Sequence, residues 1–168
     1  TTRDLAIGEV AIIESPQQQP SIVDAMEKNI ALAGSGGGIS LFSSHWLKEE
    51  GSVSQLIDGS DETPGWRTRR DQLPQEITFS FRENREAWIN FVAIRKSSQH
   101  NSTTWPKRIS IETSSSSPVS DFRPIGEFVL PRTAAEWITP IQGSARYVKL
   151  KILENHGGPY TSLGEVRI

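Results

Sequence analysis

The strongest constraint on the fold is a series of short segments, from residue 75 to the end of the chain, in which apolar and polar residues alternate. "QEITFSF" (75–81) places Ile77, Phe79 and Phe81 at every second position. Alternate residues of a β-strand lie on opposite faces of its sheet, so this period of two is typical of a strand with one buried face. The later segments with strand character are "AWINFVAI" (87–94), "RISIET" (108–113), "FRPIGEFVL" (122–130), "EWITPI" (136–141), "ARYVKLKIL" (145–153) and "LGEVRI" (163–168). Turn clusters such as "SSSSPVSD" separate them, and the pattern predicts an all-β fold, a sandwich or a barrel.

The first forty residues have a different character. "AIGEVAII" (6–13) is typical of a strand, "ESPQQQP" of a linker, and "SIVDAMEKN" (21–29) of a helical turn or two. Because "AIGEVAI" resembles the closing "SLGEVRI", the first segment is either the last strand of a preceding module or an extra strand on this one. We therefore predict an N-terminal strand and linker over 1–28 and a β-sandwich domain over 29–168. The glycine run "GSGGG" (34–38) lacks the Gly-Lys-Ser/Thr ending of a phosphate loop, so it is interpreted as a turn.

Composition excludes several classes of protein. The chain has 168 residues and a net charge of −2, which suits one ordinary domain and disfavours nucleic acid as a partner. It has no cysteine, so disulfides, thiol catalysis and thiolate metal sites are excluded, and its three histidines show no ligand spacing. No apolar run reaches the roughly 18 residues that a membrane span needs. Since the first residue is Thr1, we expect a mature product or an excised domain.

The segment "LIDGSDETPGW" (56–66) concentrates carboxylates in a turn. It is not an EF-hand, because Thr63 replaces the required glycine and Arg69 stands where the closing glutamate belongs. Two interpretations remain from the residues alone. The turn is either an ordinary solvated acidic turn or part of a cation site, since Ca²⁺ takes six to eight hard oxygen ligands.

The chain as a whole resembles the discoidin family, also called the coagulation-factor 5/8 C-type domain, which is similar to bacterial carbohydrate-binding modules. The resemblance covers residues 29–168 and rests on "NIALAGSGG", "LIDGSDETPGW", "PQEITFSF", "WPKRISIETS", "ARYVKLKILENHGG" and "LGEVRI" in that order. It implies an eight-stranded, antiparallel jelly-roll β-sandwich with a galactose-binding-like fold. It also implies one structural calcium ion. The ligands would be the carboxylates of Asp58 and Glu165, oxygens of Thr63, and backbone carbonyls of Gln55, Ser60 and Gly164. One extra residue between Thr63 and Trp66 departs from the family pattern.

Aromatic and polar residues divide into a predicted core and predicted loops. Trp66, Phe79, Trp88, Phe91 and Tyr147 are assigned to the core. The loop residues available for a ligand are His45, Trp46, Arg67, Arg69, Arg70, Arg95, His100, Asn101, Trp105, Asn155, His156 and Tyr160. The resemblance favours Arg95 and Asn101 as a sugar-binding pair, on one surface with Tyr160 or His156, and we add Arg67 and His100. The histidine that galactose-binding relatives carry after the tryptophan is replaced by "WRTRR", which argues against plain galactose recognition and leaves acidic sugars open, because arginine forks bind carboxylates well. For each of these residues an exposed polar loop is an equally simple interpretation.

The resulting prediction is a non-catalytic carbohydrate-binding module of a larger extracellular, periplasmic or cell-surface protein. Its partners would be a carbohydrate or a cell-surface glycan, and neighbouring domains of the same chain. The alternative is a structural or protein–protein adhesion module on the same fold without sugar binding. A hydrolase is disfavoured because the sequence contains neither a G-x-S-x-G elbow nor H-E-x-x-H.

Overall fold

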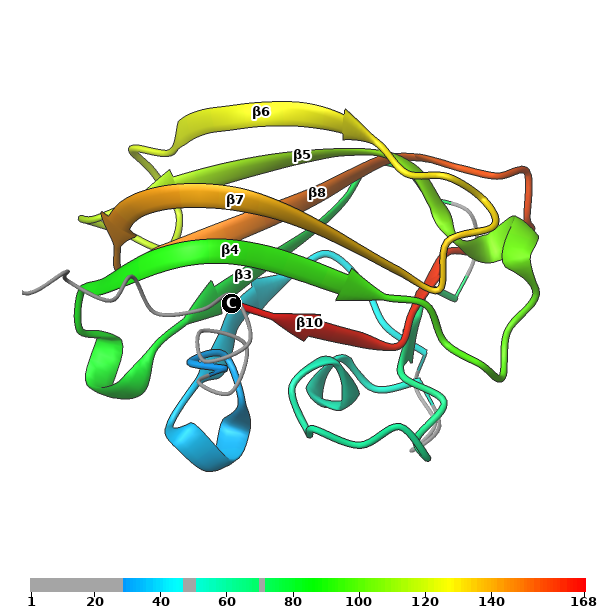
Figure 1. Ribbon diagram of the computed structural model, residues 1–168, viewed down its shortest axis with the longest axis horizontal. Helices are drawn as coiled ribbons and strands as arrows, with labels where there is room; N and C mark the ends of the chain where they lie inside the picture. Colours follow the sequence, from blue (N-terminus) through cyan, green and yellow to red (C-terminus); the bar gives the residue numbers. More distant parts are fainter. Residues whose placement is uncertain (1–28, 47–50, 70–71) are drawn as a thin grey trace, which may run out of the picture.

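The structure is a computed structural model that describes residues 29–46, 51–69 and 72–168. The fold is an antiparallel β-sandwich, as predicted (Figure 1). The predictions for residues 1–28 lie outside the described residues. Within the described ranges, no helix has the length and apolar character needed to cross a membrane.

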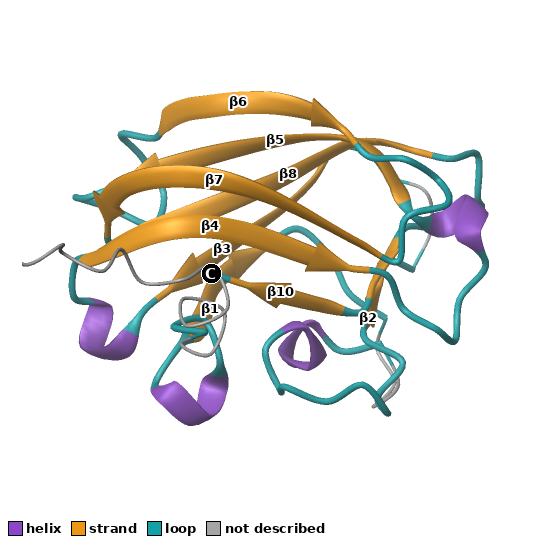
Figure 2. Ribbon diagram, in the orientation of Figure 1, coloured by secondary structure: helices purple, strands orange, loops and turns teal. Residues whose placement is uncertain are grey.

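Within the described residues, the strands form three sheets. The five-stranded sheet has the order β1 (Gly38–Phe42), β3 (Gln75–Ser80), β8 (Tyr147–Asn155), β5 (Pro106–Ser114) and β6 (Arg123–Val129). The three-stranded sheet has the order β10 (Glu165–Arg167), β4 (Ala87–Arg95) and β7 (Glu136–Ala145). The third sheet pairs β2 (Trp66–Arg67) with β9 (Ser162–Leu163). Short 3₁₀ turns connect them (Figure 2): η1 (Ala33–Ser35), η2 (Val53–Leu56), η3 (Arg82–Asn84) and η4 (Ser102–Thr104). The glycine run 34–38 spans the end of η1 and the start of β1, in agreement with its interpretation as a turn.

The core lies between the sheets and consists of the inward positions of the alternating segments. Leu150 of β8 pairs with Ile77 of β3 on one side and with Ile111 of β5 on the other, and all three side chains are buried. Burying such a side chain stabilises the fold by about 1.5–3 kcal/mol. The residues that the period of two predicts to face the core are therefore the ones that are buried.

Two tryptophans do not lie where the sequence predicted. Trp88 was assigned to the core, but its exposed fraction is 65%. The prediction was wrong because the apolar run of β4 hides its alternation: Ile89 and Phe91 point inward, while Trp88 and Asn90 point outward. Trp105 was assigned to a ligand-binding loop, but it is fully buried just before β5. The other predicted core aromatics are buried, namely Trp66, Phe79, Phe91 and Tyr147.

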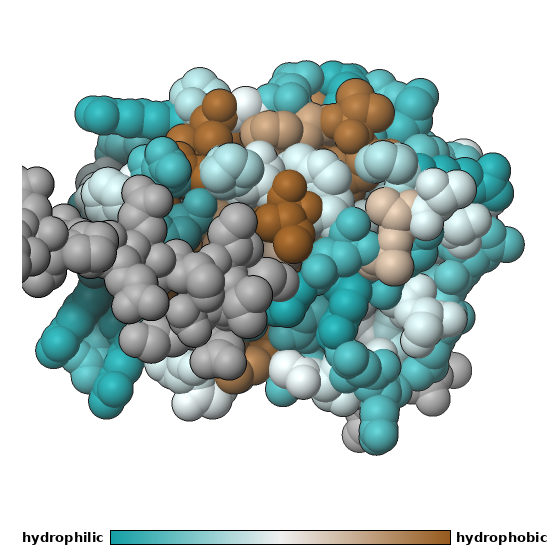
Figure 3. All heavy atoms as spheres, in the orientation of Figure 1, coloured by the Kyte–Doolittle hydropathy of each residue, from teal (hydrophilic) through white to brown (hydrophobic). Residues whose placement is uncertain are grey.

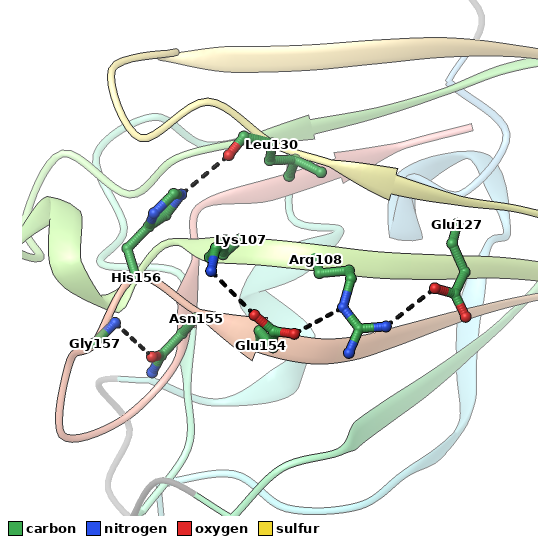
Figure 4. Close-up of polar contacts among 8 residues, drawn as sticks. All are labelled: Lys107, Arg108, Glu127, Leu130, Glu154, Asn155, His156 and Gly157. Carbon is green, nitrogen blue, oxygen red and sulfur yellow. Dashed lines mark hydrogen bonds and ion pairs between the residues drawn. The ribbon is translucent and has the colours of Figure 1, made fainter.

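The outer face of the five-stranded sheet is held by cross-strand ion pairs (Figure 4). Arg108 of β5 donates from Nε to Glu154 of β8 at 2.8 Å and from Nη1 to Glu127 of β6 at 3.1 Å. Lys107 approaches the same Glu154 at 3.2 Å. Exposed pairs of this kind contribute little to stability, typically about 0–1 kcal/mol each. In the view of Figure 3, apolar atoms form separate groups among polar ones rather than one continuous patch.

The sandwich has two distinct ends along its long axis. At one end, the right in Figure 1, β4 and β8 finish and η4 and the β2–β9 pair lie. At the other end, β7 finishes, β4 begins, and β5 turns into β6. The first and last described residues meet, because Ile30 N–H donates to the Ile168 carbonyl at 2.8 Å and Ile168 N–H donates to Asn29 Oδ1 at 3.2 Å.

Candidate functional site

The acidic turn, defined here as residues 57–65, is anchored to its neighbours by hydrogen bonds. Ser97 Oγ donates to the Pro64 carbonyl at 2.6 Å, and Gln99 Nε2 donates to the Glu62 carbonyl at 2.9 Å. At its start, the Ile57 carbonyl accepts from Ala33 N–H at 2.8 Å. These bonds hold the turn against the loop that follows β4, so its carboxylates have defined neighbours.

Glu165 is the most unusual charged residue of this region. Its exposed fraction is 2%, and its Oε2 has no hydrogen-bond partner among the described residues. Burial, and next the negative charge of Asp58, raise the pKa of Glu165 to about 7, although Arg95 and the Gly59 N–H act in the opposite direction. Two adjacent carboxylates, one of them buried, are stable together only with a proton or a cation between them.

The remaining predicted calcium ligands lie close to this pair. A small cavity of about 110 Å³ is lined by Ser60, Thr63 and Gly164. Asp58 is exposed, and its Oδ1 accepts from Ser60 N–H at 2.9 Å. Among the described residues no three His, Asp or Glu side chains cluster in a way that could hold a metal. A cation here would therefore need backbone carbonyls besides the two carboxylates, and that donor set suits Ca²⁺.

Gln55, also predicted as a calcium ligand, lies in the preceding 3₁₀ turn with its side chain engaged. Its Oε1 accepts from Gly51 N–H at 3.2 Å, so the side chain closes the loop that contains Gly51. Only its backbone carbonyl was predicted to bind the ion, and that role stays a prediction.

Arg95, the last residue of β4, lies beside the acidic turn. It forms an ion pair with Asp61 and lines the same cavity as Ser60 and Thr63. Its backbone pairs with Glu165 in the β4–β10 register. Among the described residues it forms no hydrogen bond or ion pair with Asn101 or Tyr160, and a ligand surface shared by the three stays a prediction.

A different group of side chains meets at the same end of the sandwich. The guanidinium carbon of Arg67 lies 4.3 Å from the centre of the Trp46 ring and 5.1 Å from that of Tyr160. His100 meets the Tyr160 ring edge-on, with 5.7 Å between ring centres and an interplanar angle of 81°. We call these four residues the loop-end cluster. All four residues are partly exposed, although the Nε2 of His100 is buried.

The backbone positions Arg67 and Trp46 directly. Arg67 lies in β2 and pairs with Ser162 of β9, and its carbonyl accepts from Trp46 N–H at 2.9 Å. Gly51 packs beneath both side chains, since a Cβ at this position would lie 2.9 Å from Arg67 Cγ and 3.2 Å from Trp46 Cβ. A larger residue at position 51 would therefore displace the stacked pair.

The Tyr160 loop is fixed by Asn155 at the end of β8. Asn155 Nδ2 donates to the carbonyls of Gly158 and Tyr160 at 3.1 and 3.0 Å, and Asn155 Oδ1 accepts from Gly157 N–H at 2.9 Å (Figure 4). The loop is thereby folded on itself, which keeps Tyr160 in place before any ligand arrives. Such preorganisation reduces the entropy lost on binding.

His100 enters this cluster as an uncharged ring. Burial, and next the positive charge of Arg67, lower the pKa of His100. Its Nδ1 lies 3.5 Å from the Tyr160 hydroxyl, a long contact, so most of the hold on both rings comes from their edge-to-face packing. Arg67 is thus the one cation of the loop-end cluster at neutral pH.

Two predicted ligand-binding residues, His156 and Asn101, make contacts within the protein. His156 Nε2 lies 3.0 Å from the Leu130 carbonyl and points toward the end of β6 (Figure 4). Asn101 caps η4, because its Oδ1 accepts from Thr103 N–H at 3.1 Å. Whether either also touches a ligand stays a prediction. Trp46, in contrast, belonged only to the wider set of loop residues, and no feature of the sequence links it to Arg67.

Comparisons with known proteins agree with this architecture. No family model matches the sequence, and no curated protein matches it. Solved structures do match. A carbohydrate-binding module from Clostridium perfringens in complex with GalNAc-β-1,3-galactose has 22% identity and a TM-score of 0.67 over 79% of this chain and 94% of that one.

Two further solved structures show the same likeness. The family 32 carbohydrate-binding module of NanJ from C. perfringens, in complex with galactose, has 18% identity and a TM-score of 0.66, over 79% and 92% of the two chains. Chitosan-binding module 1 of a chitosanase/glucanase from Paenibacillus sp. IK-5 has 21% identity and a TM-score of 0.63, over 83% and 97%. The chain therefore has the discoidin-type, galactose-binding-like β-sandwich fold, which it shares with family 32 carbohydrate-binding modules.

Proposed function

We propose that this chain is a non-catalytic carbohydrate-binding module of a larger extracellular, periplasmic or cell-surface protein, and that the loop-end cluster binds the sugar. The observation that carries the proposal is the position of Arg67 beside Trp46 and Tyr160. Arg67 forms no ion pair with any residue that the structure describes, so its N–H groups are available to a ligand.

The chemistry of the cluster suits a saccharide. Aromatic rings pack against the apolar C–H face of a sugar, while directional donors and acceptors recognise its hydroxyls. The guanidinium of Arg67 can donate two parallel hydrogen bonds to vicinal hydroxyls or to a carboxylate. His100 packs edge-on against the Tyr160 ring and so orients it, while its own Nε2 is buried. Solved modules of the same fold contain galactose or GalNAc-β-1,3-galactose, which supports the ligand class.

We further propose one structural calcium ion at the acidic turn. Its ligands would be Asp58 and Glu165, with oxygens of Gln55, Ser60, Thr63 and Gly164. The buried Glu165 carboxylate, with an oxygen that lacks a partner among the described residues, supports this proposal. The ion would neutralise the two carboxylates and join the turn to the last strand. It would stabilise the fold rather than contact the sugar, because the sugar-binding residues named above are not among its ligands.

The second candidate function is a structural or adhesion module without sugar binding. One observation favours it: Arg67 packs on the rings of Trp46 and Tyr160, so part of each aromatic surface is already occupied by the protein. Binding of an intact partner protein in place of a free glycan would support this alternative.

A glycan array with neutral and acidic saccharides, followed by titration calorimetry of the hits, tests the proposal. Binding that is lost in Tyr160→Ala, while the fold is retained, is the expected result. If no glycan of either class binds the folded, calcium-loaded protein, the carbohydrate proposal is wrong. A preference for acidic glycans that Arg67→Ala removes would identify Arg67 as a carboxylate-binding residue.

A further inference from the structure

Trp88 is an exposed aromatic ring at the end of the sandwich opposite the loop-end cluster. Its exposed fraction is 65%, and it lies at the start of β4, the left end in Figure 1. Its indole N–H donates to Asn90 Oδ1 at 3.1 Å, and Asn90 is the next outward residue on the same strand. This bond aligns the indole with the strand, so the ring is held and still accessible.

A polar cavity lies at the same end of the sandwich as Trp88. It has a volume of about 310 Å³ and is lined by residues 113–116, Asp121, Arg123 and Ser144. Ser144 of β7 pairs directly with Trp88 in the β4–β7 register. Directly opposed residues on neighbouring strands have Cβ atoms about 5 Å apart on one face, so Ser144 connects the ring to the cavity.

The polar groups around the cavity are ordered by bonds among themselves. Glu86 Oε1 accepts from Ser144 Oγ at 2.7 Å and from Ser115 Oγ at 3.3 Å, which ties β7 to the loop after β5. Asp121 Oδ2 accepts from Ser116 Oγ at 2.9 Å and from Ser120 Oγ at 3.1 Å. Arg123 forms no ion pair with any described residue. The cavity thus presents hydroxyls and a carboxylate held by hydrogen bonds, together with the guanidinium of Arg123.

We propose that Trp88 and this cavity form a second carbohydrate-contact surface. One sugar residue would pack its C–H face on the indole, and hydroxyls of the same or the adjoining residue would bind Ser144, Asp121 and Arg123. The cavity contains both a carboxylate, from Asp121, and a guanidinium, from Arg123. Because these opposite charges offset each other, it suits neutral saccharides better than strongly charged ones. The inference rests on the ligand class of the proposed function, but it uses none of the residues of the loop-end cluster.

The position of this surface distinguishes it from the loop-end site. The two lie at opposite ends of β4, so one short saccharide cannot contact both. A long or branched glycan, or two chains of one polysaccharide, could occupy both surfaces together. Two weak contacts linked in this way bind far more tightly than either alone.

Nuclear magnetic resonance of the tryptophan indole N–H groups tests the inference. The chain has five tryptophans, and comparison with Trp88→Phe and with Trp46→Phe assigns the Trp88 and Trp46 signals. Galactose, GalNAc-β-1,3-galactose and chitosan oligosaccharides serve as probes. We expect at least one probe to shift the Trp88 signal in a saturable way, both in the wild type and in Tyr160→Ala. Trp88→Ala should weaken that binding about three- to tenfold, as expected for one aromatic contact.

Each other outcome counts against one proposal or the other. A Trp88 signal that no probe moves overturns this inference, and it leaves the proposed function intact if the Trp46 signal shifts. A Trp88 signal that depends on protein concentration but not on sugar indicates contact between two copies and also overturns it. If Trp88 responds and Trp46 does not, the loop-end site is wrong and the second surface stands.

Discussion

The guanidinium carbon of Arg67 lies 4.3 Å from the centre of the Trp46 ring. This contact holds a cation at the loop end of the sandwich without a carboxylate partner among the described residues. It fixes the plane of the guanidinium and so the direction of its N–H groups.

Replacement of Arg67 should therefore reduce glycan binding more than it reduces stability. Arg67→Ala should weaken binding about ten- to a hundredfold, because charge-assisted hydrogen bonds contribute about 1.5–3 kcal/mol. Arg67→Lys keeps the charge but loses the fork, and it should recover only part of the affinity. Titration calorimetry measures both, with Arg82→Ala, an exposed arginine in η3, as the control. Equal affinities for all three variants would remove Arg67 from the site.

Gly51→Ala should disturb the loop-end cluster through packing. Gly51 has a φ of +98°, and a Cβ there would lie 2.9 Å from Arg67 Cγ. Gly36→Ala is the matched control, because Gly36 has a φ of +90° and the nearest atoms to a Cβ added to it belong to the exposed, flexible side chain of Arg82, which is not part of the loop-end cluster. Both variants should lose about 1–2 kcal/mol from the left-handed backbone. Only Gly51→Ala should lose more than this and bind glycan more weakly. Melting curves and calorimetry compare the two, and identical behaviour would contradict a role for this packing.

Calcium should stabilise the protein, and the effect should require Asp58 and Glu165. An ion bound only by the folded state adds about 2.7 kcal/mol at a hundredfold excess over its Kd, which corresponds to several degrees in Tm for a domain of this size. Thermal unfolding with calcium and with chelator measures the difference, which Asp58→Ala and Glu165→Ala should abolish. Equal Tm values for the wild type in both conditions, with no metal found by elemental analysis, would make the turn an ordinary solvated one.

The pH dependence of stability in chelator should depend on Glu165. The pKa of Glu165 is raised to about 7 in the folded state from a reference value of 4.5. Between these values the folded state keeps a proton that the unfolded state has released, so the free energy of unfolding should fall as pH rises, by on the order of 3 kcal/mol in total.

Glu165→Gln cannot titrate at this position, so its free energy of unfolding should not show this fall. Chemical denaturation in chelator between pH 4.5 and 8 measures both proteins. Calcium should offset the loss above pH 7, because the cation favours the ionised carboxylate. If the free energy of unfolding depends on pH in the same way in the wild type and in Glu165→Gln, the titration of Glu165 is not the cause of the fall.

The two misassigned tryptophans should differ sharply in their effect on stability. Trp105 is fully buried, so Trp105→Ala should cost about 3–5 kcal/mol in the free energy of unfolding. Trp88 is 65% exposed, and Trp88→Ala should stay within about 0.5 kcal/mol of the wild type. Urea unfolding separates the two, and a large loss in Trp88→Ala would indicate that the ring is covered in solution.

The fold was predictable because strand alternation is a local signal. Ile77, Phe79, Ile109 and Ile111 lie inward as their spacing required. Trp88 was not predictable in the same way, because the alternation in β4 runs through residues that are nearly all apolar. Trp105 was mistaken for a loop residue because its neighbours are polar, although its own ring points into the core.

The candidate site was predictable only in part, because contacts between side chains that are far apart in the chain have no local signal in a single sequence. The resemblance supplied Asp58 and Glu165, and the structure places their charges close enough to affect each other. Arg95 ends β4, at the place in the chain that the relatives suggest, but its side chain forms an ion pair with Asp61, and no feature of the sequence indicates that pair. The contact of Arg67 with Trp46 depends on β2 and Gly51, and neither spacing nor residue type indicates it.

The hydrogen bonds that join residues 29 and 30 to Ile168 have a consequence for any longer polypeptide of which this fold is a part. A chain that enters at Asn29 and leaves at Ile168 does both at nearly the same point. The sandwich therefore adds almost no distance between the segments that flank it. The sandwich would be joined to the rest of such a polypeptide at one place on its surface. It could be gained or lost between neighbouring units without changing their spacing, and it could pivot about that point to bring either end of β4 to a surface.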